Sequence, residues 1–136
     1  MDPELIIDDE MEPDPRLNEV TNAILGAAFD VHTALGAGYQ EAIYANALEL
    51  EFRRRGIHYE REVKFSVFYK GDEVGRGCVD FVVEKCIIVE LKAVEALTPI
   101  FTAQVISYLK ALKLKLALLL NFNVRRLRDG IKRIAR

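Results

Sequence analysis

The chain has 136 residues, 51% of them hydrophobic, which is enough for one domain whose core needs neither a disulfide nor a metal ion to hold it together. Its longest apolar run, residues 116–120, is far shorter than the ~20 residues that cross a bilayer, which excludes a membrane-spanning function. The formal net charge of −2 hides an asymmetry, because residues 1–14 hold seven acids and no base, whereas residues 15–136 carry +5.

The N-terminal residues 1–14 are rich in acids and prolines and predict a disordered tail, which leaves residues 15–136 as the domain. An acidic N-terminus lacks the basic region that a secretory signal peptide requires. Two cysteines without such a signal indicate a reducing compartment. We therefore expect a cytoplasmic protein with no membrane partner.

Two helices are predicted to follow the tail. Residues 16–35 carry apolar side chains at helical spacing and are expected to end near Gly36. A glycine-containing turn leads into a second helix over residues 41–56, with Gly56 as its C-cap. The two segments therefore form a helical pair at the start of the domain.

Strands are predicted next, because the apolar period changes from helical spacing to two. Residues 63–69 place alternate side chains on one face, and residues 70–75 supply a hairpin turn. Residues 76–83 and 86–93 read as two further strands. Three consecutive strands joined by tight turns predict an antiparallel part of the sheet.

The last third of the chain is predicted to return to helices around one more strand. Thr98 and Pro99 mark the start of a helix that runs through residue 112, with Thr98 as N-cap. Residues 114–120 favour a buried strand by length and flanks, although periodicity alone also fits a helix. Residues 123–136 predict a basic, amphipathic last helix. The order α, α, β, β, β, α, β, α predicts an α/β sandwich with a mixed sheet.

Two carboxylates and an amine stand inside the apolar strands, at Asp80, Glu90 and Lys92. A two-residue loop at residues 84–85 would put the Asp80 carboxylate on the face opposite to that of Glu90. A three-residue loop at residues 84–86 would place Asp80 directly across from Glu90, with Cβ atoms ~5 Å apart on one face and Lys92 two residues along. Both registers fit the pattern.

The three-residue register favours a metal site. Two ionised carboxylates at that distance repel, and a divalent cation relieves the repulsion through the oxygen ligands that Mg²⁺ prefers. The ammonium of Lys92 would then act on a metal-bound water or on a phosphate. The alternative is that Glu90 and Lys92 form a solvated ion pair on an edge strand.

These residues resemble a known motif. Asp80 followed by Glu90-Leu91-Lys92 is similar to the core motif of the PD-(D/E)XK nuclease superfamily, which has the restriction-endonuclease-like fold. The residue before Asp80 is Val79 where the superfamily's name has proline, a departure that many members share.

Two further patterns sharpen the resemblance. Gly38, Glu41 and Tyr44 fit a Gly-x-x-Glu-x-x-Tyr signature, and Gln104 and Tyr108 have the Gln-x-x-x-Tyr spacing of RecB-like members. Over roughly residues 17–136 the chain resembles the GxxExxY protein family within that superfamily. The resemblance implies an αβββαβ core with a mixed central sheet flanked by helices.

The resemblance also implies a site that depends on Mg²⁺ or Mn²⁺. By position, Asp80, Glu90, the Leu91 carbonyl and Glu41 would hold the metal, and Lys92 would be the catalytic lysine. Asp80, Glu90 and Glu41 would thus serve in both catalysis and metal binding.

Further residues and partners follow from the same resemblance. Gln104 and Tyr108 would contact the substrate or support the lysine. The implied activity is hydrolysis of phosphodiester bonds in nucleic acid, with DNA favoured, by a homodimer or with a partner protein. The alternative is a catalytically silent nuclease-fold module that binds nucleic acid or protein.

The supporting residues also have plain structural interpretations. Glu41 suits a helix N-terminus because of the helix dipole. Tyr44 is more typical of a core side chain, and Gln104 with Tyr108 would also suit a packed, hydrogen-bonded pair. His32 near a helix end is typical of a local hydrogen-bonding group, and we leave it out of the metal ligands.

Overall fold

The computed structural model describes residues 14–136, so the expected acidic tail, apart from Asp14, lies outside the described residues. The elements follow the chain as α1 (Pro15–Leu35), α2 (Glu41–Arg54), β1 (Tyr59–Tyr69), β2 (Asp72–Val83), β3 (Ile87–Lys92), α3 (Pro99–Leu112), β4 (Leu116–Asn121), the 3₁₀ helix η2 (Leu127–Gly130) and β5 (Ile131–Ala135). No helix within residues 14–136 is both long and apolar enough to span a membrane.

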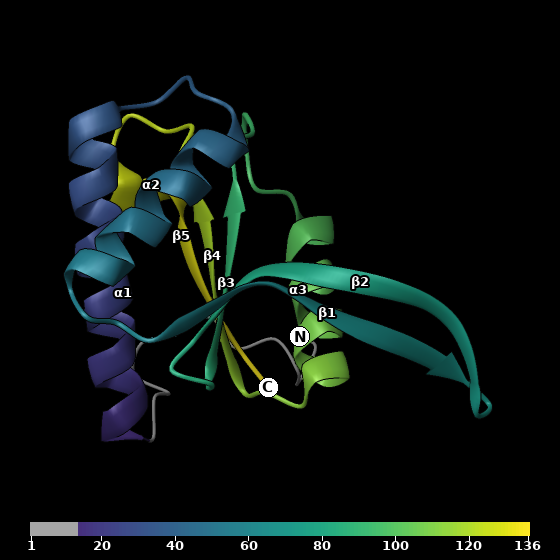
Figure 1. Ribbon diagram of the computed structural model, residues 1–136. Coiled ribbons are helices and arrows are strands. Elements are labelled where there is room, and N and C mark those ends of the chain that lie inside the picture. The colour runs from purple at the N-terminus through teal and green to yellow at the C-terminus, as the bar shows by residue number, and fades with distance from the viewer. Residues whose placement is uncertain (1–13) are drawn as a thin grey trace.

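One mixed sheet organises these elements, with its strands in the order β1-β2-β3-β4-β5. Strands β3 and β4 run parallel, and the other neighbours run antiparallel. Helices α1 and α2 cover one face of the sheet, and α3 covers the other (Figure 1). The predicted α/β fold class, with a mixed sheet between helices, is confirmed.

Strand periodicity divides the core between the two faces. On β3, Ile87, Val89 and Leu91 pack with α1 and α2, whereas Ile88 packs with α3. Strand β4 repeats this alternation, and all of its residues are buried, as expected for a strand covered on both faces. Any polar side chain at residue 90 or 92 therefore faces α3.

Helix ends are fixed by local hydrogen bonds. The Asp14 carboxylate accepts the Arg16 N–H at 2.9 Å and caps α1, and Gly36 ends that helix with φ 69°. Arg55 caps α2, and Gly56 follows it with φ 68°. The predicted cap is thus one residue late, because glycine takes the left-handed position just after the cap.

The predicted last helix is wrong. Residues 127–130 form one 3₁₀ turn, and Ile131–Ala135 form β5, which pairs antiparallel with β4 from Leu120↔Ile131 to Leu116↔Ala135. Gly130 approaches the chain so closely that a Cβ there would lie 2.2 Å from the Asn121 carbonyl oxygen. A strand is more favourable here than a helix, because it supplies hydrogen-bond partners for the backbone groups at the otherwise unpaired edge of β4.

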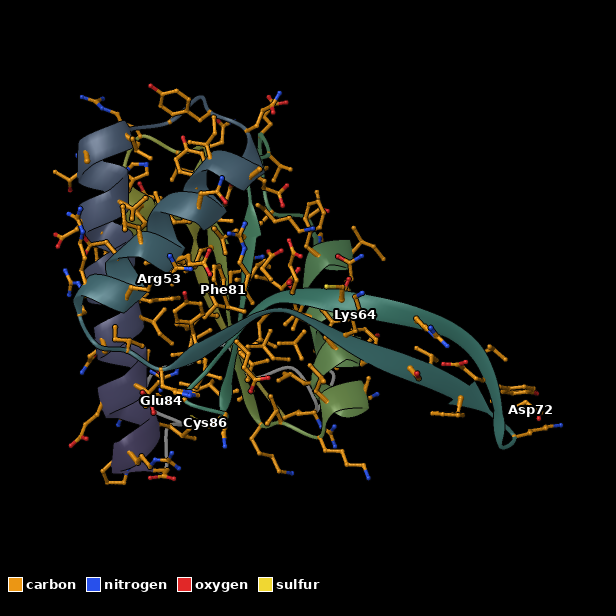
Figure 2. All side chains as sticks on the ribbon, in the orientation of Figure 1. Arg53, Lys64, Asp72, Phe81, Glu84 and Cys86 are labelled. Carbon is orange, nitrogen blue, oxygen red and sulfur yellow. The ribbon has the colours of Figure 1, made fainter. Side chains whose placement is uncertain are left out.

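A long hairpin arm, which we define as residues 65–77, extends from the body beyond α3 (Figure 1). Its turn is Lys70-Gly71, both with positive φ, as a two-residue hairpin loop with right-handed strand twist requires. Figure 2 shows Asp72 at the tip, far from the helices. The arm leaves large apolar side chains in water, namely Val67, Phe68, Tyr69 and Val74.

Candidate active site

The turn between β2 and β3 decides the register of the two strands. Val83 pairs with Ile87, and Phe81 pairs with Val89, so the loop is the three residues 84–86. Glu84 and Lys85 both adopt positive φ, at 52° and 58°. Of the two registers that the sequence allows, the three-residue one is observed, and it places Asp80 opposite Glu90.

Hydrogen bonds join Asp80 and Glu90 across the two strands. Glu90 lies between Val89 and Leu91, which pack toward α1 and α2, so its side chain faces α3. Alternation is interrupted at Asp80, because Val79 and Phe81 on either side of it pack on opposite faces of the sheet. The backbone pairing of β2 with β3 ends at Phe81↔Val89. Beyond it, the Glu90 carboxylate accepts the Asp80 N–H at 2.6 Å, and the Asp80 carboxylate accepts the Leu91 N–H at 2.8 Å. Each acid therefore binds the backbone of the opposite strand.

Burial controls the charge of this acid pair. Glu90 is only 5% exposed, and burial, reinforced by the charge of Asp80, raises the pKa of Glu90 to about 8. Burial also raises the pKa of Asp80, although the Leu91 N–H and the charge of Lys92 oppose the shift. Near neutral pH the pair therefore retains a proton unless a cation compensates its charge.

Lys92 shares the α3 face with Glu90, two residues along β3. Its ammonium lies 5.0 Å from the centre of the Phe101 ring on α3, within the range of a cation–π contact. β3 lies inside the sheet between β2 and β4, and Glu90 is buried. A solvated Glu90–Lys92 pair on an edge strand is therefore excluded.

Glu41, the first residue of α2, approaches the same place from the other helical layer. Partial removal from water is the main cause that raises its pKa, and the charge of Asp80 adds to it. Lys92 and a hydrogen bond from the Ala93 backbone act in the opposite direction. Glu41 thus interacts electrostatically with Asp80 and Lys92, although it lies 39 and 51 residues before them in the chain.

Tyr44, the tyrosine of the Gly-x-x-Glu-x-x-Tyr pattern, has a structural role. It is fully buried and stacks on Phe122, with ring centres 4.7 Å apart. Its hydroxyl donates to the Gly36 carbonyl at 2.5 Å and accepts the Tyr39 N–H at 3.2 Å. Gly38 between them has φ 111°, which favours glycine. Tyr44 is therefore a core residue that anchors the loop leading to Glu41.

Gln104 and Tyr108 lie on the stripe of α3 that begins at Phe101, at i, i+3 and i+7. Burial first, and then the negative charges of Glu90 and Asp80, raise the pKa of the Tyr108 phenol. Gln104 is exposed, and its side chain makes no hydrogen bond within residues 14–136. Tyr108 therefore lies within electrostatic reach of the acids, whereas Gln104 faces solvent between Phe101 and Tyr108.

Asn121, at the end of β4 beside Lys92, was missed by sequence reasoning. It is 1% exposed; its oxygen accepts the Val94 N–H at 3.1 Å, and its amide donates to the Val94 carbonyl at 2.9 Å. It therefore fixes the segment that follows Lys92 and that contains Ala93. The available signal is an asparagine that ends an otherwise apolar strand.

His32 lies elsewhere and binds protein rather than joining the acids. Its Nε2 hydrogen-bonds the Val124 carbonyl at 2.8 Å, which assigns the proton to that nitrogen. The ring lies 6.2 Å from the ring of Phe122. The expected hydrogen-bonding role is observed, but it is not local, because Val124 lies 92 residues away in the chain.

The donors at the site suit a hard divalent cation, although they do not form a finished cage. Within residues 14–136 no three His, Cys, Asp or Glu side chains are grouped to hold a metal ion. Asp80 and Glu90 each direct an oxygen to a backbone N–H instead. Each carboxylate has a second oxygen, and oxygen donors fit Mg²⁺ and Mn²⁺ better than softer metals.

The sequence profile of the PD-(D/E)XK nuclease superfamily matches residues 18–134. The chain is a member of the PD-(D/E)XK nuclease superfamily. This finding agrees with the mixed sheet between helices and with the acid pair on β2 and β3. No curated protein matches the sequence.

Comparison with a solved structure supports the architecture alone. The crystal structure of SSO0001 superposes with a TM-score of 0.55 at 18% sequence identity, over 87% of this chain. The chain spans 58% of the length of SSO0001. At this identity the likeness concerns the fold of this superfamily member, and its activity has to be argued from its own residues.

Proposed function

We propose that this protein is a divalent-metal-dependent nuclease that hydrolyses phosphodiester bonds of nucleic acid, with DNA favoured over RNA. Superfamily membership supports the reaction class. The observation that carries the proposal is the pair of half-buried Asp80 and buried Glu90, in which burial raises both pKa values and the charge of Asp80 raises that of Glu90 further, so that a bound cation is favoured. The Gly38, Glu41 and Tyr44 signature supports a finer placement in the GxxExxY family.

Asp80, Glu90, the Leu91 carbonyl and Glu41 would hold Mg²⁺ or Mn²⁺. When bound, such a cation supplies Lewis-acid stabilisation of phosphate oxygens and lowers the pKa of a coordinated water. To bind the cation, Asp80 and Glu90 would each give up a hydrogen bond from a backbone N–H. Glu90 would also lose its proton. Glu41 approaches from α2 and would complete the carboxylate set from the second layer.

Lys92 would act on the substrate as a fixed positive charge. Its ammonium is held on the α3 side by Phe101 and lies near the acids. From there it can orient the attacking water by hydrogen bonding and stabilise charge that develops on the phosphate. Gln104 and Tyr108, on the facing stripe of α3, would contact the substrate.

The basic C-terminal segment supports phosphate binding in a form different from the expected helix. Arg125, Arg126 and Arg128 are exposed on the loop and 3₁₀ turn after β4. Because β3 and β4 are parallel, this loop leaves the sheet at the same end of the strands as Lys92 and Ala93. Contacts from these arginines to the backbone of nucleic acid should weaken as salt rises.

A cleavage assay with matched variants tests the proposal. Labelled DNA and RNA, single-stranded and duplex, are incubated with Mg²⁺ or Mn²⁺. Asp80→Asn and Lys92→Met should each reduce the rate by about 100-fold or more, since each removes a group from the reacting centre. Asp72→Asn at the arm tip and Lys85→Met in the exposed turn should retain activity. Equal cleavage by Asp80→Asn and wild type would reject the site.

A catalytically silent module is the second candidate, and one observation favours it. Both acids bind backbone N–H groups, and the described residues hold no ready three-ligand cluster. Such a module would bind nucleic acid or a partner protein without metal-dependent cleavage. Binding that is unaffected by Mg²⁺, with no cleavage in any arm of the assay, would favour this alternative.

A further inference from the structure

A groove runs between the arm and α3, next to the acid pair. It encloses about 600 Å³, within the range of small-molecule sites. Phe65 and Phe68 from the arm and Tyr108 from α3 line it, together with Arg76 and Lys110. Gly77, which also lines the groove, lies on β2 only three residues before Asp80, so the groove is close to the site described above. The negative charges of Glu90 and Asp80 act on the Tyr108 phenol, which agrees with this placement.

The aromatic wall of the groove is preformed by a glycine. Phe65 pairs directly with Gly77 across the hairpin, and its ring lies over the glycine. A Cβ on Gly77 would lie only 2.2 Å from Cζ of the Phe65 ring. The centre of the Phe65 ring also lies 5.3 Å from that of the Tyr108 ring, with the two rings tilted by 53°. Gly77 therefore lets Phe65 lie against the arm backbone beside Tyr108.

The groove has the charge of a binding site for an anion. Arg76 and Lys110 contribute to its lining, and none of the described lining residues is acidic. Arg76 also contacts Glu73 at 3.1 Å, but its side chain is 76% exposed, and such surface pairs are weak. Aromatic rings beside cations fit a ligand that combines flat rings with phosphates, and nucleic acid carries both in every nucleotide.

We propose that this groove binds unpaired bases next to the scissile phosphate, so that the substrate is single-stranded nucleic acid or a single-stranded end. This inference rests on the proposed nuclease function. Bases inside a duplex are stacked on one another and cannot enter a side groove, whereas unpaired bases stack on aromatic side chains in a sequence-tolerant way. Arg76 and Lys110 would follow the backbone of the same strand.

A groove-filling variant separates this inference from the nuclease proposal. Ser107 is exposed on α3 and lines the groove, so Ser107→Trp fills it without disturbing the core. The control Asn22→Trp adds the same side chain to an exposed position of α1, on the opposite helical layer. Binding of a fluorescent oligothymidylate, and of a duplex of the same length, is measured without divalent metal. Cleavage is measured separately.

The wild type should bind the single strand more tightly than the duplex. Ser107→Trp should weaken single-strand binding by roughly tenfold, the loss expected from one stacked base, and Asn22→Trp should not. Equal binding by Ser107→Trp and wild type, or preference for duplex, overturns the groove assignment even where Asp80-dependent cleavage persists. A change in oligomeric state with unchanged DNA binding, seen by light scattering, also overturns it, because a second copy then occupies the groove.

Discussion

Asp80 and Glu90 show how opposing effects settle the chemistry of a single pair of residues. Each carboxylate accepts one short hydrogen bond from a backbone N–H, and a hydrogen bond to a charged group contributes about 1.5–3 kcal/mol. These bonds favour ionisation, yet the pKa of Glu90 is still raised to about 8. Burial and mutual repulsion therefore outweigh the hydrogen bonds, and a cation would reverse the balance.

The proton on Glu90 predicts an unusual pH dependence of stability in the metal-free protein. Folded Glu90 keeps its proton up to about pH 8, whereas unfolded Glu90 releases it near the ordinary 4.5. Between these values the folded state binds more protons, so the free energy of unfolding should fall as pH rises, by a few kcal/mol in order of magnitude.

Urea unfolding between pH 5 and pH 8 measures this slope. Glu90→Gln mimics the protonated acid and should flatten it, whereas Glu60→Gln, at an exposed position of β1, should not. If the stability of the wild type rises from pH 5 to pH 8, and Glu90→Gln shows the same rise, then folded Glu90 does not hold a proton near neutral pH.

Sequence spacing singles out Asp80 and Glu90 but leaves their register open. The apolar alternation around Asp80 and Glu90 allows two loops, and the choice depends on positive φ at Glu84 and Lys85. Neither residue is the glycine or asparagine that usually signals such a turn. Asn121 escaped prediction because its role depends on hydrogen bonds to Val94, which lies 27 residues away in sequence.

At the scale of elements, α2 depends on a small anchor at its start. The Tyr44 hydroxyl bridges the Gly36 carbonyl and the Tyr39 N–H, and so fixes the loop from which Glu41 enters the site. Tyr44→Phe keeps the ring that stacks on Phe122 but leaves two backbone groups without this partner. We expect a loss of about 1–3 kcal/mol in the free energy of unfolding and slower cleavage.

Chemical denaturation and the cleavage assay together check this prediction. Tyr39→Phe removes a hydroxyl from an exposed tyrosine in the same loop and serves as the control. If Tyr44→Phe is as stable and as active as Tyr39→Phe, the loop does not depend on the anchor.

The C-terminal elements show where periodicity fails. Val124, Leu127, Ile131 and Ile134 are spaced like one face of a helix, yet β5 buries Ile134 on the α3 face and packs Ile131 on the other. A short strand with only one large apolar residue on each face does not have a pattern that distinguishes it from a helix. Residues 131–135 form a strand rather than a helix because they pair with β4, which is a tertiary interaction.

Gly130 tests the tight turn into β5. A Cβ at this position would meet the Asn121 carbonyl oxygen at 2.2 Å, and backbone cannot give way as a flexible side chain can. Gly130→Ala should therefore destabilise the protein by about 1–3 kcal/mol, measured by urea unfolding. Gly75→Ala, where a Cβ meets nothing within 4 Å, should be nearly neutral. Equal stability of the two variants would show that the turn can relax.

At the scale of the whole molecule, the fold places the acid pair in the body, close to the base of a protruding arm. The strand pattern predicts β1 and β2 but not that their distal halves leave the sheet, because residue alternation does not report what covers each face. The exposed residues Val67, Phe68 and Val74 follow from that departure.

The most direct test of the central claim is anomalous diffraction from a crystal soaked with Mn²⁺. The account predicts a Mn²⁺ peak between the carboxylates of Asp80 and Glu90, with Glu41 turned toward it. It also predicts that at least one hydrogen bond from a carboxylate to a backbone N–H is exchanged for the metal. A Mn²⁺ peak elsewhere, or a saturated soak that leaves both hydrogen bonds intact with no peak at the pair, would contradict the account.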